Sequence, residues 1–229
     1  MKLGSKFNKI GDVNDMKKWL LITIAAILLV AMVVTLSIVI VKEKLPKGVA
    51  AQVNGVNITK EQVAQVLEFN EIQIEGFTRV LQQTLNDKQE IQKYITQFSQ
   101  QFPTTQQEVI THLIQGEAVC QQLKAKGTLL SVENAEASFN EEFALLQTDE
   151  SQKAFYETLQ QVIKEKEKTM EDYVALGKAQ SYVFYNMKLA KQTFKTDGSY
   201  DESSALSLDG QFNKYLEELV AAAQVKKAR

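Results

Sequence analysis

Residues 19–41 form an uninterrupted apolar block, WLLITIAAILLVAMVVTLSIVIV, without a charged residue, a glycine or a proline. As an α-helix, a block of this length rises about 34 Å, which is enough to cross a hydrocarbon core of about 30 Å. Trp19 follows Lys17 and Lys18, and an indole ring beside lysines favours the membrane interface. The block therefore predicts a transmembrane helix, and it removes these apolar residues from any water-soluble core.

A secretory signal peptide is the alternative interpretation of the same block. The apolar region of a signal peptide typically spans about 7 to 15 residues, which is shorter than this one. Val49-Ala50-Ala51 could serve as a small-residue cleavage site, but it lies well beyond the block. We therefore expect an uncleaved signal anchor, and because Cys120 is the one cysteine, we expect no lipid anchor near the N-terminus.

Charge is unevenly distributed along the chain. Residues 1–47 hold eight lysines and three acids, whereas the remaining 182 residues hold 18 bases and 25 acids. Five lysines precede the apolar block and three follow it, a bias that places the N-terminus in the cytoplasm and residues 42–229 outside. The acidic body argues against nucleic-acid binding, which depends on clustered Lys and Arg.

The sequence predicts four parts: a cytoplasmic tail at 1–18, the anchor at 19–41, a polar stalk at 42–48 and a folded domain at 49–229. That domain opens with alternating apolar residues around Asn54-Gly55, a strong hairpin signal because both residues tolerate positive φ. We expect Ala50 to Val53 to pair with Val56 to Ile58. Asn57-Ile58-Thr59 also matches a glycosylation sequon, a pattern that recurs by accident.

Helical periodicity follows from Thr59 to near the C-terminus. Thr59 with Gln62 forms a capping box before a long amphipathic stripe, and Pro103 ends a second stripe. The remaining elements are marked by caps and turns in the same way. The expected helices cover about 60–85, 91–102, 106–126, 132–146, 151–168, 170–196 and 210–223, with a Ser-rich acidic linker at 197–209.

Three segments resemble a known family. VAAQVNGVNITKEQV at 49–63, VITHLIQGEAVCQQLKAKGTLLSVE at 109–133 and FNKYLEELVAAAQV at 212–225 are similar, in order and spacing, to parts of the SurA N-terminal domain of SurA- and PrsA-type extracytoplasmic chaperones. The resemblance implies a mainly helical domain with a small hairpin, whose C-terminal segment (210–225) returns as a helix and a short strand beside that hairpin.

The family's parvulin isomerase domain has no counterpart here. The resemblance places it between the long helices and the terminal helix, where this chain has only the 197–209 linker. Such a domain needs about one small domain of length and usually two active-site histidines, whereas this sequence has a single histidine. We expect no prolyl isomerase activity and, more generally, no enzyme.

No catalytic, cofactor-binding or metal site is expected from the remaining polar residues. His112 lacks a second His or Cys nearby, and Cys120 reads as a small core residue. The carboxylate pairs lack calcium-loop spacing and fit solvated helix faces better. They are Glu141-Glu142, Asp149-Glu150 and Glu165 with Glu167.

Apolar surface is the remaining candidate for function. If the long helices form an open cradle, their aromatic side chains could line a groove for extended polypeptide, whereas in a closed bundle they would pack the core. The candidate groove residues are Phe69, Phe77, Tyr94, Phe98 and Phe102. 

The resulting expectation is a single-pass protein of the bacterial cell membrane with an extracytoplasmic chaperone-like domain. Its expected partners are unfolded or exported polypeptides and, through residues 19–41, the lipid bilayer, with no nucleic acid. The alternative is a non-catalytic module that binds one dedicated partner in a membrane assembly. A suppression assay with denatured clients separates the two.

Overall fold

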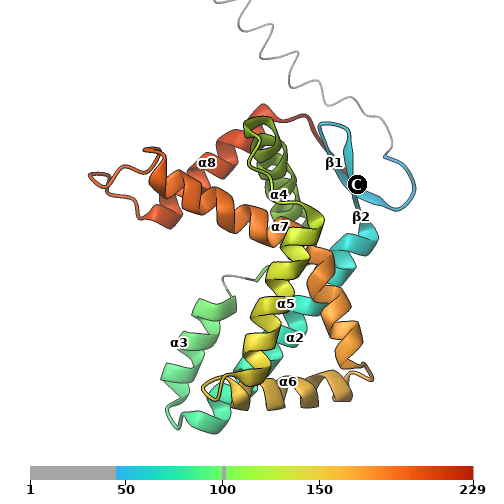
Figure 1. The fold of residues 1–229 in the computed structure, drawn as a ribbon, viewed down its shortest axis with the longest axis vertical. Helices are drawn as coiled ribbons and strands as arrows, with labels where there is room; N and C mark the ends of the chain where they lie inside the picture. Colours follow the sequence, from blue (N-terminus) through green and yellow to red (C-terminus); the bar gives the residue numbers. More distant parts are fainter. Residues whose placement is uncertain (1–44, 100–101, 229) are drawn as a thin grey trace, which may run out of the picture. The chain divides into compact units, whose positions relative to one another are not determined.

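Seven helices and a three-stranded antiparallel sheet make up the part of the chain that the computed structural model describes, residues 45–99 and 102–228 (Figure 1). In chain order they are β1 (Val49–Val53), β2 (Val56–Thr59), α2 (Lys60–Thr84), α3 (Lys88–Ser99), α4 (Gln106–Lys126), α5 (Val132–Thr148), α6 (Lys153–Glu165), α7 (Met170–Thr196), α8 (Leu208–Ala222) and β3 (Val225–Lys227).

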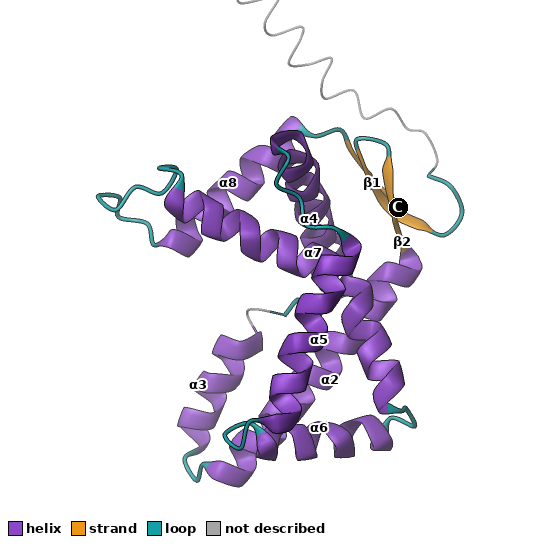
Figure 2. Ribbon diagram, in the orientation of Figure 1, coloured by secondary structure: helices purple, strands orange, loops and turns teal. Residues whose placement is uncertain are grey.

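The sheet confirms the hairpin prediction and the returning C-terminal strand (Figure 2). Asn54 and Gly55 form the turn with φ of 48° and 88°, the left-handed region that this pair tolerates at low cost. β1 lies in the centre, with β2 and β3 antiparallel on either side. The side chain of Asn54 accepts from the backbone N–H of Gln224 at 2.7 Å, so the turn itself holds the start of the terminal strand.

Capping chemistry sets the helix bounds close to the predicted ones. Thr59 with Gln62, Thr105 with Glu108 and Thr169 with Asp172 all form reciprocal capping boxes, which satisfy backbone N–H groups that a helix start leaves free. Gly127 ends α4 in the left-handed conformation at φ 70°. These local signals explain why the helical part of the fold could be predicted.

The prediction of a membrane-spanning helix as the first element of the fold is wrong for this structure. Within residues 45–99 and 102–228, no helix is long and apolar enough to cross a membrane. The physical reason is charge: even α7, the longest of these helices, carries Glu171, Asp172 and four lysines. The segment at 19–41, on which that prediction rested, lies outside the described residues.

Apolar side chains gather in three clusters instead of one core. The first joins the sheet to α2 and α4 around Val53 and Ile114. The second joins α2, α5, α6 and the start of α7 around Ile72 and Leu159. The third joins the ends of α4 and α7 to α8, with Phe194 and Phe212. Because α7 contributes to more than one cluster, it connects the two ends of the helical region.

α3 is the least buried helix of the described chain. It has no buried residue, and it turns back after α2, the helix it packs against (Figure 1). After the gap at 100–101, Asn70 of α2 donates to the carbonyl of Pro103 at 2.9 Å. This bond fixes the chain where it leaves α3 for α4.

Candidate binding cavity

A cavity of about 1060 Å³ lies among α2, α3, α4, α5, α6, α7 and α8. Its size is slightly above the range of about 300–1,000 Å³ that is usual for ligand pockets. Its walls draw on side chains from the second and third apolar clusters, including Phe69, Leu146 and Leu216. The clusters therefore leave a shared space between them that is lined mainly by apolar side chains.

One wall is a stack of three phenylalanine rings. The rings of Phe77 on α2 and Phe98 on α3 stack with centroids 4.0 Å apart. Phe102, after the gap, packs on Phe98 at 4.8 Å, and all three line the cavity. Through this stack, α3 contributes an aromatic side chain to one side of the space.

Another part of the wall carries a second group of rings, from α2, α5 and α7. Phe69 stacks on Tyr173 at 5.0 Å, and its edge meets the ring of Phe139 at 6.4 Å. Phe143 packs beside Phe139 at 6.1 Å. These rings line the cavity together with Phe155 of α6, so aromatic faces and edges meet any ligand from several directions.

Phe184 and Leu145 mark where the cavity opens to solvent. Both line the cavity, yet Phe184 on α7 is 47% exposed and Leu145 on α5 is 60% exposed. Large apolar side chains that remain exposed at the edge of an apolar cavity are typical of interaction sites.

Hydrogen-bonding side chains from several helices interrupt the apolar lining. Asn70 and Gln73 of α2 already have partners, since Asn70 donates to Pro103 and Gln73 donates to the Tyr173 hydroxyl. His112 of α4 and Gln180 of α7 also line the cavity. Within the described residues, Nε2 of Gln180 is the buried side-chain atom left without a hydrogen-bond partner.

Burial determines the ionisation of the groups around the cavity. It lowers the pKa of His112 and raises that of Tyr173, so both side chains are uncharged at neutral pH. Cys120, on the same helix as His112, is buried. Burial and, to a smaller extent, the negative charge of Glu117 raise the pKa of its thiol to about 12. A thiol with this pKa is a poor nucleophile.

Charged groups lie at the edge of the cavity in pairs. Lys188 of α7 donates to Glu142 of α5 at 2.9 Å, and Lys191 pairs with Asp209 of α8. Burial and the hydrogen bond with Glu142 raise the pKa of Tyr185. These pairs connect α7 to α5 and to α8.

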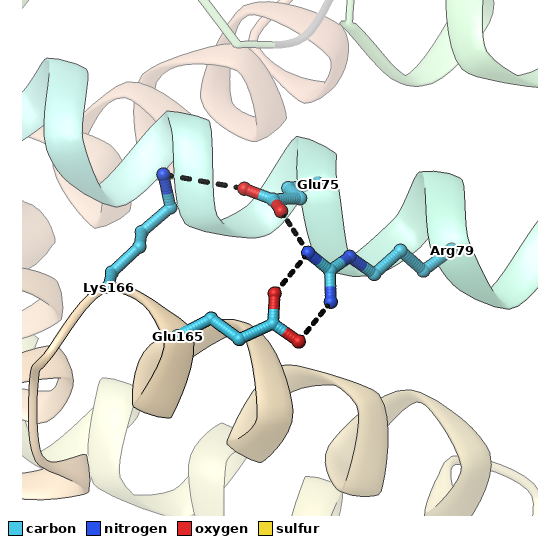
Figure 3. A network of polar contacts seen from close by, with 4 residues as sticks. All are labelled: Glu75, Arg79, Glu165 and Lys166. Atoms are coloured by element: carbon cyan, nitrogen blue, oxygen red, sulfur yellow. Dashed lines mark hydrogen bonds and ion pairs between the residues drawn. The ribbon is translucent and has the colours of Figure 1, made fainter.

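An ion network fixes α2 to the end of α6 outside the cavity (Figure 3). The guanidinium of Arg79 binds both carboxylate oxygens of Glu165, at 2.9 and 2.6 Å, and Glu75 one helical turn away at 2.5 Å. Lys166 reaches Glu75 at 3.3 Å. Glu165, one of the carboxylates considered above, thus serves an ion pair, which lowers its pKa and raises that of Arg79.

The structure brings four of the five candidate groove residues to the cavity. Phe77, Phe98 and Phe102 form the stacked wall, and Phe69 is buried in the second cluster and also lines the cavity. Tyr94 is 39% exposed on α3 and does not line the cavity. The distinction between core and groove is therefore not sharp, because Phe69 belongs to both.

The sequence alone did not identify the lining residues of α5 and α7, Phe184 in particular. One signal was available: Tyr182-Val183-Phe184-Tyr185 is an apolar run that covers more than one face of a helix. An amphipathic helix buries only one stripe, so at least one of these side chains had to remain outside the core. Within the described residues no group of three or more His, Cys, Asp or Glu side chains is placed to hold a metal ion.

Comparison with known proteins identifies no relative of the chain. No protein-family model matches the chain, and neither a curated protein nor a solved structure matches it.

Proposed function

We propose that the chain binds extended or unfolded polypeptide in the cavity among its helices and acts as a chaperone-like protein without catalysis. The observation that carries this proposal is an aromatic cavity of about 1060 Å³ whose opening is edged by the exposed side chains of Phe184 and Leu145. Burial of a client's apolar side chains there is favourable by about 25 cal/mol per Å².

The chemistry of the walls supports a polypeptide over a small polar ligand. The lining is mostly aromatic and aliphatic, and the charged residues that line it, Glu142, Lys188 and Lys191, pair with side chains of the protein itself. Apolar contacts of this kind set few geometric demands, so they permit broad specificity. The resemblance of residues 49–63 to the start of the SurA N-terminal domain implies the same class of function.

Suppression of client aggregation tests the proposal. The purified full-length chain, at a stoichiometric ratio, is expected to suppress aggregation of several unrelated denatured proteins. Replacing Phe184 and Leu145 together by Ser should abolish most of that activity without unfolding the protein, because both side chains are exposed. Val132→Ser is the matched control, since Val132 is 50% exposed and does not line the cavity.

Two results would contradict the proposal. The first is no suppression by the wild-type chain with any client. The second is equal loss of activity in the Val132→Ser control. One native partner bound at a fixed stoichiometry, with no suppression, would favour the alternative of a dedicated interaction module.

A further inference from the structure

Two polar side chains in the cavity wall have no hydrogen-bond partner of their own. Nε2 of Gln180 is buried and unpartnered within the described residues. His112 is half-buried, and burial alone accounts for its lowered pKa, with neither a charge nor a hydrogen bond contributing. A buried polar group without a partner costs folding free energy, and its retention calls for an explanation.

The two side chains come from the same contact between α4 and α7. Gly116, one turn after His112, lies directly against Val183, three residues after Gln180. Both His112 and Gln180 line the cavity. They therefore place polar groups near the contact between these two helices, in a part of the wall that Gln115 and Ser181 also line.

The chemistry of the pair matches that of a peptide group. A neutral imidazole offers one donor and one acceptor, and a carboxamide offers both as well. A peptide group presents a C=O acceptor and an N–H donor. Of the amide side chains that line the cavity, Asn70 and Gln73 are already committed to Pro103 and Tyr173. Gln180 differs from them because its Nε2 is buried without a hydrogen-bond partner.

We propose that His112 and Gln180 bind a backbone peptide group of the polypeptide held in the cavity, and so select a polypeptide over a purely apolar ligand. This inference rests on the proposed function. Rotation about the terminal bond of Gln180, which has a broad torsional profile, directs Nε2 toward the bound carbonyl. A hydrocarbon in the same space leaves that donor unpartnered, and such mismatches are what polar sites discriminate against.

Two probes separate hydrogen bonding from apolar contact in the full-length chain. One is a fluorescein-labelled peptide rich in Phe and Leu, followed by anisotropy. The other is diphenylhexatriene, a hydrocarbon without hydrogen-bonding groups, followed by fluorescence. Gln180→Met and His112→Leu remove the polar groups at similar side-chain size. Gln107→Met is the matched control, because Gln107 is exposed on α4 and does not line the cavity.

Each polar variant is expected to weaken peptide binding about five- to tenfold, the loss of one to two neutral hydrogen bonds. Diphenylhexatriene binding should change by less than about twofold in the same variants, because a hydrocarbon accepts no hydrogen bond. The Gln107→Met control should leave both unchanged.

The outcomes distinguish this inference from the proposed function. Peptide binding that is equal in wild type and both polar variants overturns the hydrogen-bonding role and leaves the proposed function standing. Equal loss of peptide and diphenylhexatriene also overturns it, since that result reports a collapsed cavity. Absence of peptide binding by the wild-type chain overturns the proposed function itself, and the inference with it.

Discussion

The ring of Phe98 stacks on the ring of Phe77 with centroids 4.0 Å apart and planes inclined by 19°. Since α3 has no buried residue, this aromatic contact holds one wall of the cavity against α2. An aromatic pair contributes about 0.5–1.5 kcal/mol beyond its area burial. The position of α3 therefore depends on a contact that is small relative to the stability of a whole domain.

Phe98→Ala is expected to release α3 while the rest of the domain stays folded. Amide hydrogen exchange over 88–99 should become faster, because local opening then costs less free energy, while exchange in α4 and α7 should not change. Mass spectrometry of peptides after exchange measures both. Tyr94→Ala on the same helix is the control, since Tyr94 is 39% exposed and stands outside the stack. Faster exchange throughout the protein would contradict the local role of Phe98.

Gly116 and Gly210 should respond to alanine with opposite signs. A methyl group at Gly116 would overlap the side chain of Val183, where α4 packs on α7. Overpacking costs about 1–3 kcal/mol, which exceeds the helix-propensity gain of about 1 kcal/mol. At Gly210 the nearest atom, Cβ of Leu206, lies 3.4 Å away, so the propensity gain should dominate.

Urea unfolding of the two alanine variants checks this expectation. Gly116→Ala should lower the free energy of unfolding by about 1 kcal/mol, and Gly210→Ala should raise it by about 0.5–1 kcal/mol. Stabilisation by both substitutions would show that α4 and α7 do not approach closely enough at Gly116 for a methyl group there to overlap Val183.

The stability of the protein should fall as the pH drops from 7.5 to 5.5, because of His112. Burial lowers the pKa of this side chain in the folded state, whereas in the unfolded chain it is near 6.5. Below about pH 6.5 the unfolded state therefore binds more protons, and linkage lowers the free energy of unfolding. The loss continues until the pH passes below the folded-state pKa.

The His112→Leu variant should remove this pH dependence, since the chain has one histidine. Carboxylates whose pKa is lowered in the folded state, such as Asp172 at the start of α7, keep their contribution to the free energy of unfolding until the pH falls to about 4. They therefore do not account for a change between pH 7.5 and 5.5. Urea titrations at pH 7.5 and 5.5 compare the two proteins. An identical pH dependence in wild type and variant would contradict burial of a neutral imidazole.

Arg79→Met is expected to destabilise the contact between α2 and α6 in a salt-dependent way. Methionine keeps an apolar stem but removes the guanidinium that binds Glu165 and Glu75. Because these groups are partly exposed, the loss should be about 1 kcal/mol at low salt and smaller in 1 M NaCl, where charges are screened. Unfolding titrations at both salt concentrations measure it.

Lys153→Met provides the comparison for Arg79. Lys153 lies 3.9 Å from Glu150, and their side chains are 60% and 88% exposed, so this pair should contribute almost nothing at either salt concentration. Equal effects of the two substitutions would indicate that the network of Arg79 is no stronger than an ordinary surface pair.

Local chemistry made much of the helical fold predictable from the sequence. The turn at Asn54-Gly55 and the capping box of Thr59 each depend on residues a few positions apart, and such interactions can be read along the chain. The predicted anchor at 19–41 lies outside the residues that the structure describes. Among the described helices none can span a membrane.

The cavity was less predictable because it depends on contacts between distant segments. Phe77 and Phe98 could be proposed together, since they lie on consecutive helices. Phe184 faces the cavity only because α7 packs on α4 and α5 and leaves that side chain exposed. Periodicity shows that a helix has an apolar face, but it does not show which parts of that face a neighbouring helix covers.

Site-specific photo-crosslinking tests the central claim, polypeptide binding in the cavity, most directly. The photoreactive amino acid p-benzoylphenylalanine would replace Phe184 at the cavity opening or, as the control, Val132, which is exposed away from the cavity. The full-length protein would be irradiated with a denatured client. We predict client crosslinks from position 184 and few from position 132. Equal crosslinking at the two positions, or none at 184 while the client is bound, would contradict the account.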